Sequence, residues 1–134
     1  MRWLGAQLDE DERIARAACW DEQSDVWTAR PPQGTYAQYE QYTVVDYCGD
    51  GVVIVRPQNA DDDGVGRHVA EHDPARVLRE IHAKRLIIEQ HERYAAERRR
   101  MMGGWDPQSD DSPILAALAS VYADRPGYKE SWRP

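Results

Sequence analysis

The sequence predicts an α+β fold, in which a long central helix packs with an N-terminal helix and a small antiparallel β-meander, and a short C-terminal helix follows. Three observations lead to this prediction. A helix start signal at Asp73 opens a stretch that runs without glycine from there to Met102. β-Branched and aromatic residues concentrate between residues 26 and 56, as is typical of strands. A second start signal at Ser112 opens a short apolar segment near the C-terminus.

The long helix is predicted over about residues 74–102. Asp73 is a favoured N-cap because its carboxylate accepts hydrogen bonds from amides of the first turn. Pro74 fits the first helical position because no intrahelical hydrogen bond is lost there. At about 100° per residue, the apolar side chains of the helix fall in one narrow stripe, formed by Val77, Ile81, Ile88, Ala95 and Met102. Leu86 falls opposite this stripe and is expected to be exposed or covered by another element.

The other elements follow from shorter patterns. Residues 2–18 predict a helix whose apolar side chains share one face, namely Trp3, Leu4, Leu8, Ile14, Ala15 and Ala18. Strands are expected within residues 26–56, and because so small a sheet is marginal alone, the long helix is expected to cover it. A helix over about residues 113–122 has as buried candidates Ile114, Leu115, Leu118 and Val121. The whole chain, 1–134, is predicted to be a single domain.

Composition excludes several classes of protein. The formal net charge of −7 argues against a general nucleic-acid binder, which needs a basic surface. No apolar run approaches the ~18 residues of a membrane span, and the N-terminus turns acidic where a signal peptide is apolar. Cys19 and Cys48 lie far apart and are interpreted as free thiols in a reducing compartment. We therefore expect a cytoplasmic protein that binds no membrane.

Residues 57–66 are predicted to form an acidic loop. Four of them match positions 1, 3, 5 and 6 of a calcium-binding loop, namely Asn59, Asp61, Asp63 and Gly64. The match then fails, because Ala70 stands where the bidentate glutamate is needed. The spacing therefore does not predict a calcium site.

The string His68-Val-Ala-Glu71-His72 has the pattern H-x-x-E-H of the inverted zincins. That chemistry requires two histidines one helical turn apart, a glutamate as general base and a third protein ligand. No downstream carboxylate stands out as the third ligand. We therefore favour a helix junction that carries two histidines, and we predict no cofactor. A hydrolase with zinc on His68 and His72 is the alternative.

A basic cluster ends the long helix, formed by Arg98, Arg99 and Arg100. Such a cluster is the charge pattern of a surface that contacts phosphates, so nucleic-acid association is a further alternative. Positive charge is also favourable at a helix C-terminus because of the helix dipole. We prefer this structural interpretation.

Three strings together resemble an uncharacterised family of small actinobacterial and actinophage proteins: LDEDERIARAA, HVAEHDPARVLREIHAKRLIIEQH and ILAALASVYADRPGYKESWRP. The resemblance implies a cytosolic origin in actinobacteria or their phages and no established activity. Relatives carry cysteines after the long helix that, with a histidine, look like a zinc knuckle. Here only His91 matches, so the zinc site does not carry over. We predict that Met101, Met102 and Trp105 pack there as an apolar replacement.

Because the sequence has no catalytic constellation, we expect a non-enzymatic interaction or accessory protein. A more specific form of this hypothesis is that the protein is encoded by a phage and acts on a host protein. An aromatic C-terminal segment is expected to supply binding residues, namely Tyr122, Tyr128 and Trp132. Self-association through the long helix, which would bury Leu86, is the other route to a partner.

Overall fold

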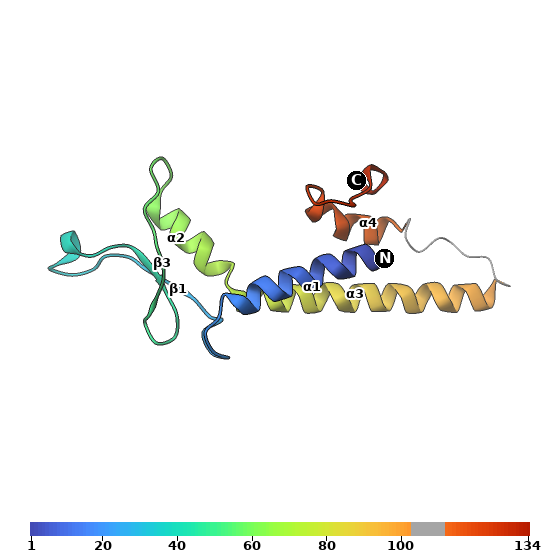
Figure 1. Ribbon diagram of the computed structural model, residues 1–134, viewed down its shortest axis with the longest axis horizontal. Coiled ribbons are helices and arrows are strands. Elements are labelled where there is room, and N and C mark those ends of the chain that lie inside the picture. The colour runs from blue at the N-terminus through green and yellow to red at the C-terminus, as the bar shows by residue number, and fades with distance from the viewer. Residues whose placement is uncertain (103–111) are drawn as a thin grey trace. The chain divides into compact units, whose positions relative to one another are not determined.

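The computed structural model describes residues 1–102 and 112–134 (Figure 1). Within these ranges the chain forms α-helices and a three-stranded antiparallel sheet, which confirms the predicted α+β class. The backbone groups into two compact units. We call Met1–Asp11 with Glu80–Pro134 the helical unit, and Glu12–Arg79 the sheet unit. Whether they fold as a single domain stays a prediction.

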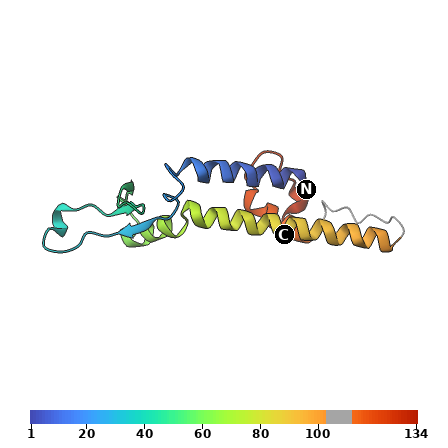
Figure 2. The same cartoon turned by 90° about the horizontal axis from the view of Figure 1, so that it is seen from below.

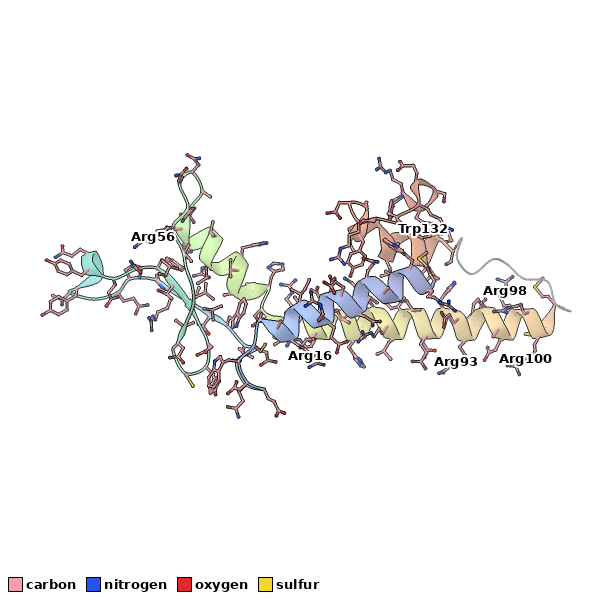
Figure 3. All side chains as sticks on the ribbon, in the orientation of Figure 1. Arg16, Arg56, Arg93, Arg98, Arg100 and Trp132 are labelled. Atoms are coloured by element: carbon pink, nitrogen blue, oxygen red, sulfur yellow. The ribbon has the colours of Figure 1, made fainter. Side chains whose placement is uncertain are left out.

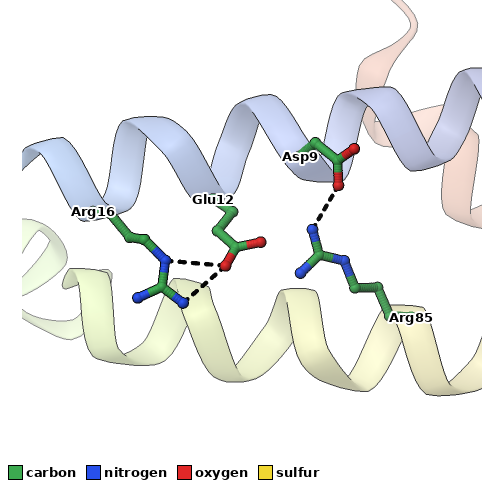
Figure 4. Close-up of polar contacts among 4 residues, drawn as sticks. All are labelled: Asp9, Glu12, Arg16 and Arg85. Carbon is green, nitrogen blue, oxygen red and sulfur yellow. Dashed lines mark hydrogen bonds and ion pairs between the residues drawn. The ribbon is translucent and has the colours of Figure 1, made fainter.

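The helical unit takes its core from three helices. Figures 1 and 2 show the first part of α1 (Arg2–Ala17) running beside α3 (Pro74–Met101), with α4 (Pro113–Ala119) nearby. Arg85 of α3 donates a hydrogen bond to Asp9 of α1 at 2.7 Å (Figure 4). The same close-up shows Arg16 donating to Glu12, one turn away within α1. The side chains buried in this unit include Leu4, Leu8, Ile81, Ala95, Leu115 and Ala119.

The predicted stripe of the long helix is buried only along part of its length. Ile81 and Ala95 are buried, but Met102 is exposed. The carboxylate of Glu92 on α3 lies 3.8 Å from the terminal ammonium of Met1, so α1 starts beside Glu92. Helix α1 therefore does not cover the last turns of α3. Leu86 is partly exposed, which agrees with the first of the two expectations, exposure or cover by another element.

The N-terminal helix α1 and the C-terminal helix α4 bury narrower faces than predicted. Ile14 of α1 is exposed, and so is Ala18, which follows the end of α1. α4 ends at Ala119 and continues as the 3-10 turn η3 (Ser120–Tyr122), and its exposed side chains include Ile114 and Val121, which the sequence assigned to the core. A helix of two turns has one face to bury, and Leu115 and Ala119, one turn apart, occupy it.

The sheet unit contains the predicted meander. The strands β1 (Thr28–Arg30), β2 (Thr43–Val45) and β3 (Gly51–Ile54) are ordered β1-β2-β3, and all pairs are antiparallel. A short 3-10 turn, η1 (Ala37–Tyr39), lies between β1 and β2. Val44 sits at the centre of the register, opposite Ala29 on one side and Val53 on the other.

The helix that covers this sheet is α2 (Asp62–Glu71), not the long helix that the sequence suggested. Its Ala70 packs in one cluster with Tyr42, Val44 and Val55. The acidic loop is therefore shorter than 57–66 and ends at Asp61. The Asp61 side chain accepts a hydrogen bond from the Gly64 amide at 2.7 Å, and so the calcium-like spacing serves a helix N-cap.

Candidate functional site

The outer edge of β3 is the least covered apolar element of the sheet. Among the described residues β3 pairs with β2 alone, and α2 packs on β1 and β2. Three consecutive side chains are exposed in consequence, Val52 at 38%, Val53 at 41% and Ile54 at 52%. By contrast, Val44 and Val45 of β2 are buried. An apolar strand with one free edge is a template on which another chain adds a strand.

Backbone hydrogen bonds show which groups point to this edge. The Val55 amide donates to the Tyr42 carbonyl at 2.8 Å, so the backbone of Val55 faces β2. Successive residues of a strand direct their N–H and C=O groups to alternate sides. The N–H and C=O of Ile54 therefore face the free edge. The register irregularity at Val44/Val45 affects the other end of β3 and leaves the pairing of Ile54 with Thr43 regular.

Opposite charges flank β3. Asp50 precedes the strand, and Arg56 follows it (Figure 3). Both residues are exposed, and within the described parts of the chain neither side chain has a hydrogen-bonding or ionic partner. The strand thus has an acidic and a basic end.

The acidic end of β3 is held by a network of aromatic donors. The indole of Trp20 donates to Asp46 at 2.7 Å, and the other oxygen of Asp46 accepts from the amides of Cys48 and Asp50. Tyr47 stacks on Trp20 at 5.9 Å. The indole hydrogen bond lowers the pKa of the Asp46 carboxyl. The turn that precedes β3 is therefore fixed by its own Asp46 and by Trp20 from outside the hairpin.

The histidine pair of the H-x-x-E-H string is brought together at the end of α2. The rings of His68 and His72 lie 4.3 Å apart, and both residues are exposed. His72 Nδ1 lies 2.8 Å from the His68 carbonyl oxygen, which leaves its Nε2 outward. No group of three histidine, cysteine or acidic side chains suited to a metal exists in the described residues. The third ligand that the hydrolase requires is thus not found there, and zinc binding by the pair stays an untested alternative.

The basic cluster lies on the exposed last turns of α3. Arg98 lies 5.8 Å from the ring of Tyr94, and Figure 3 shows Arg98 and Arg100 projecting from opposite sides of the helix. At about 100° per residue, such a pair cannot converge on one phosphate. The predicted apolar replacement beside the cluster is wrong for Met101, which is 86% exposed, and for Met102. Trp105 lies outside the described residues.

The aromatic C-terminal segment forms part of the core of the helical unit. Tyr122 and Trp132 are buried, Tyr128 is half-buried, and all three pack around Trp3 with ring centroids 5.3 to 6.4 Å away. Tyr122 donates to Asp11 at 2.6 Å. Burial, and then this hydrogen bond, raise the pKa of the Tyr122 hydroxyl. The side chains predicted to bind a partner thus pack against Trp3 inside the unit.

An additional ion pair closes this cluster. Arg125 donates to the second oxygen of Asp11 at 2.6 Å. This accounts for an acidic residue beside the apolar face of α1. The indole of Trp3 donates to the Pro126 carbonyl at 3.0 Å, next to Gly127.

A cavity of about 390 Å³ in the sheet unit was not foreseen from the sequence. Trp27 and Tyr42 line it together with charged side chains, of which Asp63, Arg67 and Asp73 make local contacts. Asp63 accepts from Tyr42 at 2.7 Å and from Arg67 at 3.0 Å. Asp73 accepts from the Trp27 amide at 3.1 Å and caps α3. Asp63 and Asp73 in the cavity wall thus serve the fold.

The fold and the site define a small α+β protein with an open sheet edge. A family model described as a family of unknown function, DUF6221, matches residues 1–134, and the chain belongs to this family. This confirms the uncharacterised family, while an actinobacterial or phage origin stays a prediction. No curated protein and no solved structure matches the chain. Within the described residues, no helix is long and apolar enough to cross a membrane.

Proposed function

We propose that this protein is a non-enzymatic interaction protein that binds a protein partner through the free edge of β3. The observation that carries the proposal is the run of exposed apolar side chains at Val52, Val53 and Ile54 beside unpaired backbone groups. Strand addition uses both features, because backbone hydrogen bonds supply affinity and the flanking side chains are covered.

The absence of protective devices on β3 supports this assignment. Edge strands are usually blunted by lysine, proline or an inward charge. The four residues of β3 contain none of these. Only the register irregularity near Val45 acts in this way, and it lies at the end of β3 away from Ile54.

Two other functions have less support. A hydrolase needs a third zinc ligand, and the described residues provide none beside His68 and His72. Nucleic-acid association has to overcome a net charge of −7, and Arg98 and Arg100 diverge around α3. Neither function explains the exposed strand.

We extend the proposal to the cellular location and the biological origin of the protein. The sequence resemblance to actinobacterial and actinophage proteins supports a cytoplasmic accessory role, with a host protein as target if the gene belongs to a phage. Genomic neighbourhood tests this part. A position among early phage genes would support it, and a position in an operon of host metabolic enzymes would contradict it.

The test of the interaction uses matched variants. Ile54 on β3 and Ile14 on α1 are 52% and 51% exposed, so Ile54→Lys and Ile14→Lys place the same charge at equally accessible positions. Each purified protein is immobilised and exposed to actinobacterial lysate, and bound proteins are identified by mass spectrometry and titrated in purified form. We expect a partner, a second copy of this chain included, that binds wild type and Ile14→Lys and binds Ile54→Lys at least tenfold more weakly. Equal binding by all three would contradict the proposal.

A further inference from the structure

We infer that the partner on β3 is a second copy of this chain, paired antiparallel to the first along the free edge. The inference rests on the proposed function and specifies its partner. It follows from the charge order along the strand, from the direction of the backbone groups and from the shape of the apolar run.

The charge order selects the antiparallel arrangement. Asp50 and Arg56 are six positions apart on extended chain, about 20 Å, so one copy cannot pair them with each other. In an antiparallel pair the acidic end of each strand lies beside the basic end of the other. A parallel pair would set Asp50 beside Asp50 and Arg56 beside Arg56, and like charges directly opposite are unfavourable.

The backbone groups fit a two-fold axis at Val53. Such an axis places Ile54 of one copy opposite Val52 of the other. The N–H and C=O of Ile54 already face the free edge, because Val55 uses its amide on Tyr42. Each copy therefore presents the same donor and acceptor, which is the requirement of an isologous interface. Two residues farther out, the same axis brings Asp50 of each copy beside Arg56 of the other.

The apolar run is self-complementary under this axis. Val53 meets its own counterpart, and Val52 meets Ile54, so β-branched side chains face one another along the new pair. β-Branched side chains fit such a pleated, half-buried surface. The two three-stranded sheets would become one sheet of six strands, and the contact would cover the β3 edge of each copy.

The test is a charge swap read by sedimentation equilibrium over a range of protein concentrations at low salt. We expect a wild-type dimer. Asp50→Arg and Arg56→Asp should each weaken it about tenfold, since either change replaces two attractive contacts with two repulsive ones. The double variant, Asp50→Arg with Arg56→Asp, should restore the dimer. Neither side chain has a partner among the described residues, so the variants should keep the wild-type circular dichroism and melting temperature.

Matched variants locate the contact. Ile54→Lys should abolish the dimer, and Ile14→Lys should leave it intact. A dimer lost on Leu86→Lys and kept by Ile54→Lys would place the interface on α3 and overturn the inference. So would a protein that is monomeric at all concentrations, or a double charge variant that fails to recover.

These outcomes separate the inference from the proposed function. A monomeric protein that still binds another protein in an Ile54-dependent manner would reject the second copy as partner and keep β3 as an interaction edge. A monomeric protein with no Ile54-dependent partner would reject both.

Discussion

The C-terminal aromatic segment and the strand β3 are both apolar, but the chain covers one and leaves the other open. Tyr122 and Trp132 are buried around Trp3, whereas Val52, Val53 and Ile54 are exposed. The difference does not lie in hydrophobicity, since valine and isoleucine are fully buried in proteins more often than tyrosine or tryptophan. It lies in how many elements reach each segment.

Long-range polar contacts decide which segment is covered. In the helical unit, Asp11 near the start of the chain binds both Tyr122 and Arg125, and so ties the C-terminal segment to α1. In the sheet unit, α2 packs on β1 and β2 and does not reach β3 to the same extent. A closed cluster is sensitive to any added atom, and an open edge is not. The predictions below test this contrast.

The largest effect is expected at Gly127, in the closed cluster. Its φ is +87°, a conformation that side chains rarely adopt, and a Cβ there would lie 2.6 Å from the indole nitrogen of Trp3. Gly127→Ala should therefore lower the free energy of unfolding by about 3 kcal/mol, from backbone strain and overpacking together. Urea denaturation followed by circular dichroism measures it.

Gly34 provides the control for this variant. Its φ is +77°, but no atom lies within 4 Å of the position of a Cβ. Gly34→Ala should cost only the backbone strain, about 1 kcal/mol. Equal losses for the two variants would show that Trp3 yields to the added methyl group at no cost, and so that the cluster is not closely packed at Gly127.

A second effect is expected where the sheet is covered. A Cβ on Gly66 of α2 would lie 2.3 Å from the ring of Tyr42, which is buried and held by its hydrogen bond to Asp63. Gly66→Ala should destabilise the protein by about 2 kcal/mol. At Gly5 of α1, no atom lies within 4 Å of the position that a Cβ would take. Gly5→Ala should therefore stabilise the protein by about 0.5–1 kcal/mol, because alanine favours the helix. Thermal denaturation of both variants should give shifts of opposite sign.

Removing one hydroxyl from the closed cluster should have a smaller effect. Tyr122→Phe deletes the hydrogen bond to Asp11 and leaves Arg125 on that carboxylate, so a loss of about 1–2 kcal/mol is expected. Tyr94→Phe, at an exposed position on α3, should change stability by less than about 0.5 kcal/mol. A Tyr122→Phe variant as stable as wild type would show that the contact to Asp11 does not hold the C-terminal segment.

Local signals made the helix starts predictable. The Asp73 carboxylate accepts from the Arg76 amide, and the Ser112 hydroxyl accepts from the Ile114 amide, as their cap positions predict. These contacts lie within four residues of each other, and so they depend little on the rest of the fold. The same is true of the meander, whose strands lie within the predicted region.

Contacts between distant residues could not be predicted. The start of α2 was hidden because Gly64 and Gly66 are poor helix formers, yet the Asp61 cap and the close approach of Tyr42 favour a helix there. The exposure of β3 could not be predicted either, since a run of β-branched residues is equally typical of a buried strand. The candidate site thus became visible only when the elements covering each strand were known.

The smallest effect is expected from acid, and it is expected in the sheet unit. Hydrogen bonds from aromatic side chains lower the pKa of three carboxyls from their ordinary value of 3.8, namely Asp21 beside Tyr47, Asp46 beside Trp20 and Asp63 beside Tyr42. Because each folded-state pKa lies below the unfolded value, the ionised carboxylates stabilise the fold above pH 3.8. This contribution is lost as the pH falls through the folded-state pKa values.

Tyr42→Phe isolates one of these contacts, because it removes the donor to Asp63 and keeps the buried ring. The variant should melt below wild type at pH 6, and the difference between the two melting temperatures should shrink as the pH falls below 3.8. Tyr36→Phe, at an exposed position, should follow the wild-type curve throughout. A Tyr42→Phe deficit that stays constant down to pH 2.5 would mean that the hydroxyl acts by packing against Gly66, and that the carboxylate of Asp63 adds nothing to holding α2 on the sheet.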